Sequence, residues 1–257
     1  MTSTQRPKPT TQRQTQREAR PHAAGQAHPL AALPAKVGGA VIATAVRGLA
    51  AVRPAEKPMH PAGRVLHGRL ERHGLEPGIG VPFVDRAGVD EVVARESKGL
   101  GLPAGLPDIH GLALKVPLGG ATVDEARDGS GGHADLLLST NGWGPVTRFL
   151  VVPSAGMTTR PLTTLFPYRS PRGPVLLGAR YVDERHVELA VAGLRSDWRV
   201  FADLHLELEE PGPTGDGTDD PELEFDAILN ELPELPNYDW VRRVRAPSYA
   251  VARRSRR

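Results

Sequence analysis

Four short stretches of this chain carry residue types that could do chemistry. The first, KPMHPAGRVLHGRLERHG (57–74), contains three histidines. The second, ARESKGLGLPAGLPDIHGLALKVP (94–117), places an arginine, a serine, an aspartate and a histidine around a loop rich in glycine and proline. The third, ADLLLSTNGW (134–143), ends in polar residues, and the fourth, RVRAPSYAVARRSRR (243–257), holds six arginines, no acid and one tyrosine, Tyr249. These imidazole, carboxylate, hydroxyl and phenol groups are the candidate acids, bases and ligands.

Local context supports two geometric expectations about these residues. Arg95 and Ser97 are two positions apart, so in a strand their side chains share one face. His60 precedes Pro61, which favours an extended or turn conformation at the histidine. Each observation also has an ordinary structural interpretation, since strand faces and turns exposed to solvent carry such residues routinely.

A metal-dependent hydrolase, similar to a phosphodiesterase, is one alternative function. Histidine and carboxylate side chains could gather into a hydrolytic metal centre. No pair of them has the spacing of a known metal motif, such as two histidines one helical turn apart. The candidate ligands are His60, Asp108, His110 and His133.

Composition indicates one sizeable globular domain. The 257 residues are 39% apolar, and the 28 glycines and 25 prolines suit many short strands joined by turns. There is no cysteine, which excludes disulfides, thiolate metal sites and a cysteine nucleophile and fits a reducing cytoplasm.

Charge is concentrated at the two ends of the chain. Residues 1–30 carry five basic residues and one acid, whereas residues 242–257 carry seven arginines and no acid. The net charge is only +2, so the region between the ends is acidic, which argues against a nucleic-acid partner. The most apolar stretch, 37–52, is interrupted by Arg47 and is shorter than the roughly 20 residues of a membrane span.

Hydrophobic periodicity divides the chain into a tail and a β-rich domain. Residues 1–30 are polar and predict a disordered basic tail, followed by a single domain over 31–257. Helices are expected over 36–52 and 223–232, and 209–222 reads as an acidic solvated loop. The pattern predicts eight strands, over 64–70, 91–97, 111–117, 134–140, 147–153, 174–182, 186–192 and 198–208.

Two of these strands alternate cleanly. In 111–117, leucine and valine side chains share one face, while Ala113 and Lys115 take the other. In 198–208, Trp198, Val200 and the following even-numbered apolar residues point one way. Eight mostly antiparallel strands with few helices predict an α+β fold built on a closed antiparallel β-barrel.

Together these segments resemble the haem-dependent catalase fold, in the short form of catalase-related peroxidases. HPAGRVLHGRLE (60–71) looks like the segment that begins with the distal histidine of catalases. ARES (94–97) with HGLALKV (110–116) is similar to the Arg-Phe-Ser strand and the later Arg-Gly-x-Ala-x-Lys-Phe strand, and ADLLLSTN (134–141) resembles Trp-Asp-Leu-x-x-Asn-Asn. The four motifs occur in the family's order and cover most of 57–257.

On the distal side, the resemblance implies that His60 is the acid–base catalyst and that Ser97 orients its ring. Arg95 and Lys57 correspond to residues that pair with the haem propionates. Strict alignment places Thr140 at the family's distal asparagine, with Asn141 one residue later. The family's phenylalanine after Arg95 is a glutamate here.

On the proximal side, Arg245-x-x-x-Tyr249 matches the spacing of the family's Arg-x-x-x-Tyr motif. The resemblance implies that Tyr249 binds the iron of haem b as phenolate, and that Arg256 falls on a family arginine. A free phenol has a pKa near ~10. The anion at neutral pH therefore needs the iron and a guanidinium hydrogen bond from Arg245. Pro247 lies between the two residues and would interrupt a continuous helix.

The resemblance implies a peroxidase that reduces hydrogen peroxide or organic hydroperoxides with a small electron donor, and the absence of cysteine predicts a cytoplasmic protein. The long arms of tetrameric catalases are missing, so a monomer or homodimer is expected. The main alternative is a catalytically degenerate barrel that binds haem or another small hydrophobic ligand without turnover.

Overall fold

The computed structural model describes residues 62–103, 105–208 and 223–245. All of them belong to one compact unit, Glu56–Arg257. The tail expected over 1–30, the helix expected over 36–52 and the acidic loop expected over 209–222 lie outside the described residues.

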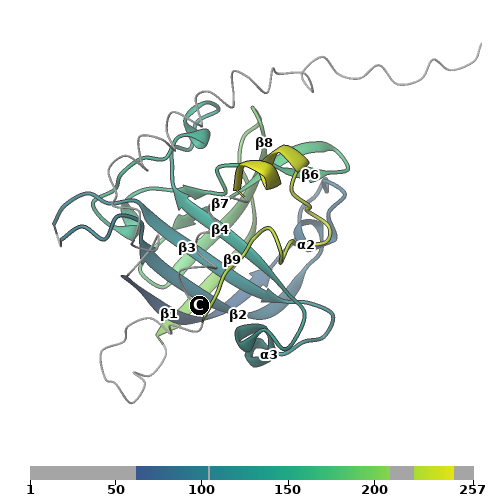
Figure 1. Ribbon diagram of the computed structural model, residues 1–257. Helices are drawn as coiled ribbons and strands as arrows, with labels where there is room; N and C mark the ends of the chain where they lie inside the picture. Colours follow the sequence, from purple (N-terminus) through teal and green to yellow (C-terminus); the bar gives the residue numbers. More distant parts are fainter. Residues whose placement is uncertain (1–61, 104, 209–222, 246–257) are drawn as a thin grey trace, which may run out of the picture. The chain divides into compact units, whose positions relative to one another are not determined.

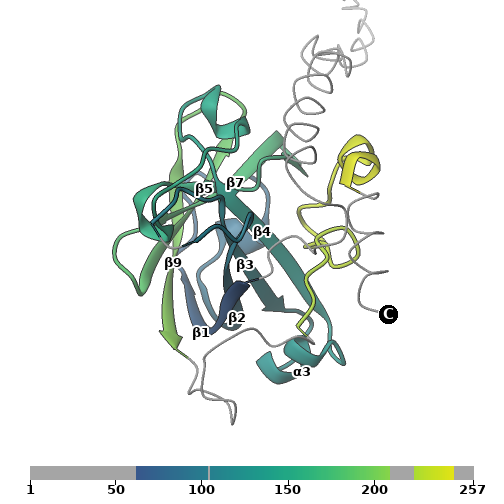
Figure 2. The same cartoon turned by 60° about the vertical axis from the view of Figure 1, so that its left-hand side comes forward.

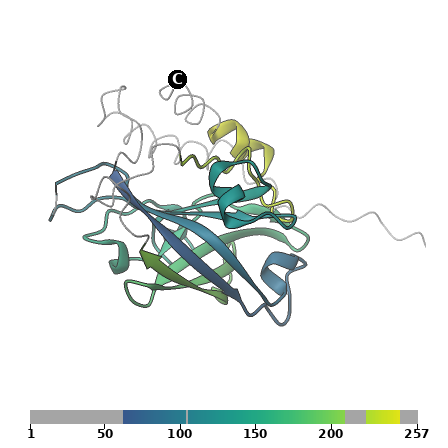
Figure 3. The same ribbon diagram turned by 90° about the horizontal axis from the view of Figure 1, so that it is seen from below.

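The described chain forms a closed, entirely antiparallel barrel (Figure 1). The strands are β1 (Ala62–Arg72), β2 (Gly88–Lys98), β3 (His110–Pro117), β4 (His133–Thr140), β5 (Leu162–Thr163), β6 (Tyr168–Ser170), β7 (Gly173–Tyr181), β8 (His186–Gly193) and β9 (Arg199–Leu208). The sheet order is β5-β4-β3-β2-β1-β9-β8-β7-β6, and an additional pairing of β5 with β7 closes a ring of eight strands, with β6 outside it. The expected eight-stranded barrel is therefore confirmed. Figure 3 shows the two longest strands, β1 and β2, side by side.

The described helices are few and short. They are α2 (Pro82–Asp85), α3 (Val123–Asp128), and the 3₁₀ turns η2 (Thr147–Phe149) and η3 (Met157–Thr159), and residues 239–245 are also helical. The start of α3 is set by a capping box, in which Thr122 and Glu125 satisfy each other's backbone N–H groups. None of the helices in these ranges is long and apolar enough to cross a membrane.

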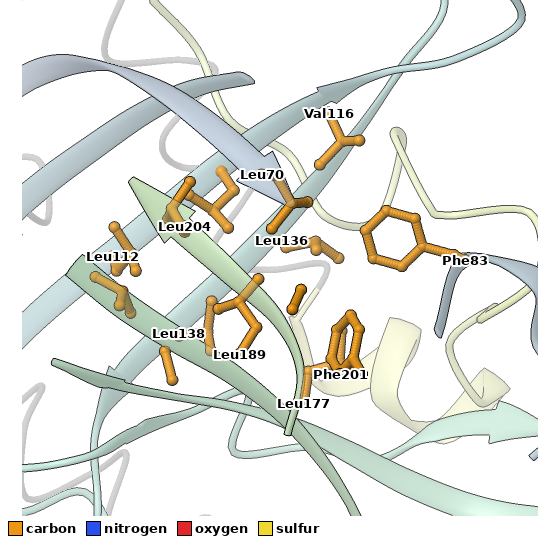
Figure 4. Packing of buried hydrophobic residues seen from close by; sticks show 14 of the residues in the cluster. Leu70, Phe83, Leu112, Val116, Leu136, Leu138, Leu177, Leu189, Phe201 and Leu204 are labelled. Atoms are coloured by element: carbon orange, nitrogen blue, oxygen red, sulfur yellow. The ribbon is translucent and has the colours of Figure 1, made fainter. Parts of the chain in front are cut away.

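Aliphatic side chains fill the barrel lumen (Figure 4). The inward positions of each strand alternate, so that Leu112, Leu114 and Val116 of β3 are almost completely buried, as expected from the sequence. Full burial of each such side chain contributes roughly 1.5–3 kcal/mol. At the end of the barrel next to α2, Phe83 packs edge to face on Phe201, with ring centroids 6.1 Å apart. The lumen is therefore a packed core.

Two expected elements are wrong. Residues 147–153 are not a strand, because the chain turns through η2 and Val151 makes only an isolated bridge to Asn141. The buried guanidinium of Arg148 organises this turn by donating to the carbonyls of Gly144 and Gly193. Residues 223–232 form turns rather than a helix: the Asp226 N–H and the Asn230 carbonyl bind Asp135 of β4, and the Asp226 carboxylate accepts from the backbone N–H groups of the two residues 228 and 229. The strand that completes the ring is the two-residue β5, which the sequence pattern did not predict.

Two side-chain environments also differ from what simple alternation predicts. A register shift at Leu189 and Ala190 opposite β9 leaves both Phe201 and Ala202 buried, while Val200 is 39% exposed. Lys115 does point away from the lumen, but it is only 2% exposed. The C-terminal segment covers it, with the ring of Phe225 5.0 Å from its ammonium group.

Candidate functional site

The outer face of β2 presents Arg95 and Ser97 side by side, as the sequence predicts. Arg95 lies opposite Val65 and Ala113, and Ser97 lies between the glycines of β1 and β3. Gly63 leaves room for the guanidinium of Arg95, since a Cβ at that glycine would lie 3.1 Å from the Arg95 Cζ atom. Small residues thus surround a cation and a hydroxyl on this face of the sheet.

The two candidates for the distal amide position are both hydrogen-bonded within the protein. Thr140 is fully buried and lies on the lumen side of β4, where its hydroxyl accepts a hydrogen bond from the backbone N–H of His110 at 3.2 Å. Asn141 is also fully buried: its Oδ1 accepts from the Ser139 hydroxyl at 2.8 Å and its Nδ2 donates to the Arg148 carbonyl at 3.2 Å. Both ends of the Asn141 amide are thus used within the protein.

Arg245 ends the described C-terminal helix and carries an unsatisfied donor. Its Nη2 donates to the carbonyl of Thr164 at 3.0 Å, and its Cζ lies 4.9 Å from the ring centroid of Phe166. Its Nη1 is buried and has no hydrogen-bond partner within the described part of the chain. A buried donor without an acceptor is costly, and a charged one more so. The position therefore suits an anionic oxygen.

The segment that carries Arg245, residues 223–245, is fastened to the outside of β4 (Figure 2). The Asp135 carboxylate accepts from the backbone N–H of Asp226 at 2.6 Å and from the Asn230 side chain at 2.8 Å. The Asp135 backbone N–H in turn donates to the carbonyl of Asn230. Lys115 donates to the other carboxylate oxygen at 3.1 Å, which balances the buried charge. We call residues 223–245 the C-terminal strap.

A second ion pair orients the helical end of the strap. Glu231 receives two hydrogen bonds from the Arg242 guanidinium, at 2.9 and 2.5 Å. Asn237 donates to the same carboxylate and to the carbonyl of Ala227. Burial alone would raise the pKa of Glu231, but the bonds from Arg242 and Asn237 hold it below its ordinary value. A continuous set of contacts thus connects β4 to the helix that ends in Arg245.

The remaining predicted site residues cannot be placed. His60, Lys57, Tyr249 and Arg256 lie outside the described residues, so their roles stay predictions. The structure brings Arg95 and Ser97 together on one face and gives Arg245 a defined environment. It directs Thr140 into the lumen and uses the Asn141 side chain internally.

The proposed metal ligands do not assemble in the described ranges, where no group of three histidine, cysteine or acidic side chains could hold a metal ion. Asp108 binds its own loop, accepting from the backbone N–H groups of Leu100, Leu102 and Ile109. Burial opposes its ionisation, yet these three bonds keep the pKa of Asp108 below its ordinary value. His133 instead contacts the carbonyl of Gly131.

Two polar and aromatic groupings were missed by sequence reasoning. Inside the barrel, Glu96 binds both Arg64 and Tyr181. Outside it, Trp143 and Trp198 stack with ring centroids 4.1 Å apart. The alternation of β2 could have indicated that Glu96 faces inward, but nothing local indicates its partners.

Comparison with known proteins gives similarity at the level of structure alone. No protein-family model matches the chain, and no curated protein matches it in sequence. A fungal catalase structure superposes with a TM-score of 0.52 at 12% sequence identity, covering 84% of this chain and 62% of that one. A bacterial catalase structure gives a TM-score of 0.50 at 10% identity, covering 84% of this chain and 60% of that one. The chain therefore spans about three fifths of the length of these catalases, and it has a catalase-like β-barrel fold.

Proposed function

We propose that this protein binds haem b and acts as a peroxidase that reduces hydrogen peroxide or organic hydroperoxides at the expense of a small electron donor. The observation that carries the proposal is Arg245, whose buried Nη1 lacks an acceptor in the described chain and which stands four residues before Tyr249. A phenolate at Tyr249 would satisfy that donor. The catalase-like fold supports the same assignment.

The proximal side would be held by the C-terminal strap and the residues after it. Tyr249 would bind the iron as phenolate, and Arg245 would stabilise the anion by a charge-assisted hydrogen bond. Bound haem would supply the redox chemistry with peroxide. Arg256 would provide a further positive charge near the group.

The distal side would use fewer residues than catalases use. His60 would take the proton from one peroxide oxygen and return it to the other, so that the O–O bond breaks heterolytically. Ser97 would orient its ring, and Arg95 with Lys57 would pair with the propionates. Because Thr140 and Asn141 are engaged within the protein, peroxide would be held mainly by His60. This favours slow, donor-dependent reduction over rapid disproportionation. We further propose a cytoplasmic monomer or homodimer.

A second candidate is a barrel that binds haem or another hydrophobic ligand without turnover. The internal use of the Asn141 amide favours it, since both ends of that amide are already bound, to the Ser139 hydroxyl and the Arg148 carbonyl. Both candidates predict that the protein binds a ligand, so measurements of peroxide turnover are needed to separate them.

The test is titration of the full-length protein with hemin, monitored by absorption spectroscopy. A Soret band with high-spin ferric features is expected, and Tyr249→Phe should shift or abolish it. Arg245→Ala should weaken hemin binding, whereas Arg243→Ala is the matched control, since Arg243 is an exposed cation on the same helical segment. A wild-type protein that does not bind hemin would overturn the proposal. Binding without peroxide turnover, unchanged in His60→Ala, would select the second candidate.

A further inference from the structure

A buried glutamate joins two opposite walls of the barrel. The Tyr181 hydroxyl donates to Glu96 Oε1 at 2.6 Å, and Arg64 Nε donates to Glu96 Oε2 at 2.6 Å. Glu96 is 4% exposed and Tyr181 is 7% exposed. Each carboxylate oxygen of Glu96 therefore accepts a short hydrogen bond from a side-chain donor.

The order of the strands around the barrel places Glu96 and Tyr181 on opposite walls. Three strands separate β2 from β7 in either direction around the barrel, so Tyr181 reaches across the lumen to Glu96. Inward neighbours such as Leu66, Leu112 and Leu206 are aliphatic. A leucine would also fill the space at this point, so packing alone does not explain a carboxylate that binds a phenol.

The phenol is held in its protonated form. Burial first, and then the negative charge of Glu96, raise the pKa of Tyr181 above its ordinary value, while Arg64 opposes this only weakly. Proton loss alone is therefore unfavourable at neutral pH. Oxidation of the phenol reverses this preference, because a phenol that has lost an electron is a very strong acid.

We infer that Tyr181 is a redox-active tyrosine whose oxidation is coupled to proton transfer to Glu96. One electron leaves the phenol for a one-electron oxidant of high potential. The phenolic proton crosses the 2.6 Å hydrogen bond to Glu96 Oε1, which lies within the reach required of a general base. The products are a neutral phenoxyl radical and a carboxylic acid, and re-reduction by a donor returns both to their starting states.

The inference rests on the proposed function for its physiological oxidant, which would be the peroxide-oxidised haem. Arg95 and Ser97 point outward from β2 on either side of Glu96, which points inward. The arginine proposed to pair with the propionates therefore lies on the opposite side of β2 from the Glu96 side chain. Arg64, whose side chain is 47% exposed, connects Glu96 with solvent at the barrel end.

The test uses the full-length protein without haem, so that it does not depend on cofactor binding. A laser flash in the presence of a ruthenium tris-bipyridine complex and persulfate generates a one-electron oxidant, and electron paramagnetic resonance records the radical. Because the chain has four tyrosines, Tyr238 and Tyr249 are first replaced by phenylalanine; a tyrosyl signal is expected in this background and should be lost when Tyr181→Phe is added. Tyr168→Phe is the matched control, since it removes another buried phenol and should leave the signal in place.

Glu96→Gln separates a redox role from simple packing. The amide keeps the size of the side chain and an acceptor oxygen, but it cannot take the proton. The rate of tyrosine oxidation should fall on the order of 10²-fold, the lower end of what a positioned base contributes. A tyrosyl signal that survives in Tyr181→Phe, or an unchanged rate in Glu96→Gln, would overturn the inference.

A wild-type measurement covers the case in which a variant fails to fold. After exchange into D₂O, the radical should show coupling to one hydrogen-bonded deuteron, and its formation should slow relative to water. Absence of both effects would equally overturn the inference. If the protein does not bind hemin but forms the Tyr181 radical after the flash, only the proposed function is overturned. If it binds hemin but forms no Tyr181 radical, only this inference is overturned.

Discussion

Lys115 of β3 and Asp135 of β4 form an ion pair of 3.1 Å whose two side chains are 3% and 0% exposed. The pair lies on the outer face of the barrel, beneath the C-terminal strap. Because Asp135 also binds the backbone and side chain of the strap, the pair connects the barrel to the segment that carries Arg245.

Removing the cation alone should strongly destabilise the protein. Lys115→Met leaves a buried, uncompensated carboxylate and should cost about 3–5 kcal/mol. The double variant Lys115→Met with Asp135→Asn should lose less, because the amide oxygen can still accept from the strap and no charge remains. Urea unfolding at neutral pH measures both. The control is Arg180→Met, since the Arg180 side chain is 59% exposed and its pair with Glu188 should contribute about 0–1 kcal/mol. A double variant as unstable as the single one would contradict this account.

Gly178 should not tolerate a side chain. A Cβ there would lie 2.7 Å from the ring of Trp198 and 2.8 Å from that of Trp143. These rings stack on the outside of β7 and line a small pocket of about 90 Å³. Gly178→Ala should therefore cost about 1–3 kcal/mol through overpacking and should change tryptophan fluorescence. Gly156→Ala is the control, because its added Cβ would meet nothing closer than 3.7 Å. Equal melting temperatures for the two variants would contradict the packing argument.

Acid should loosen the C-terminal strap through Glu231. The folded pKa of Glu231 is lower than its unfolded value, because Arg242 and Asn237 bind the carboxylate despite its burial. Its contribution to stability is therefore complete above the unfolded pKa of about 4.3 and is lost as pH falls through the folded pKa. Glu231→Gln should be less stable than the wild type at neutral pH and should lose less stability on acidification. Unfolding free energies between neutral pH and about pH 3 test this, with the exposed Glu184→Gln as control. Parallel pH curves for wild type and Glu231→Gln would refute it.

Asn141 should prove to be a structural residue, whether or not haem is bound. Asn141→Ala leaves the Arg148 carbonyl and the Ser139 hydroxyl without this partner in a buried region, which should cost about 1–3 kcal/mol. Thermal unfolding without hemin shows the loss. Ser139→Ala gives the comparison, because it removes one of these bonds and should cost less. If Asn141→Ala were as stable as the wild type yet impaired in peroxide turnover, the residue would act on peroxide after all.

The strands and their inward faces were predictable because alternation is a local property of the chain. Leu112, Leu114 and Val116 mark the lumen side of β3 without reference to any other strand. Seven of the eight expected strands are present for this reason. The expected strand over 147–153 is absent because the buried Arg148 guanidinium binds the carbonyls of Gly144 and Gly193 and holds the segment in a turn.

Tertiary structure alone decided how the barrel closes and which polar residues it buries. The closing strand β5 has two residues, too few to show a period, and it is a strand only because β4 and β7 lie on either side of it. Lys115 and Glu96 look like ordinary strand charges in the sequence. Their burial depends on partners far along the chain. Glu96 binds Tyr181, which is 85 residues away. Lys115 binds Asp135, which in turn binds Asn230, 95 residues further along the chain. Local pattern therefore determined the faces of the strands, whereas contacts between distant segments determined which of their polar groups are buried and paired.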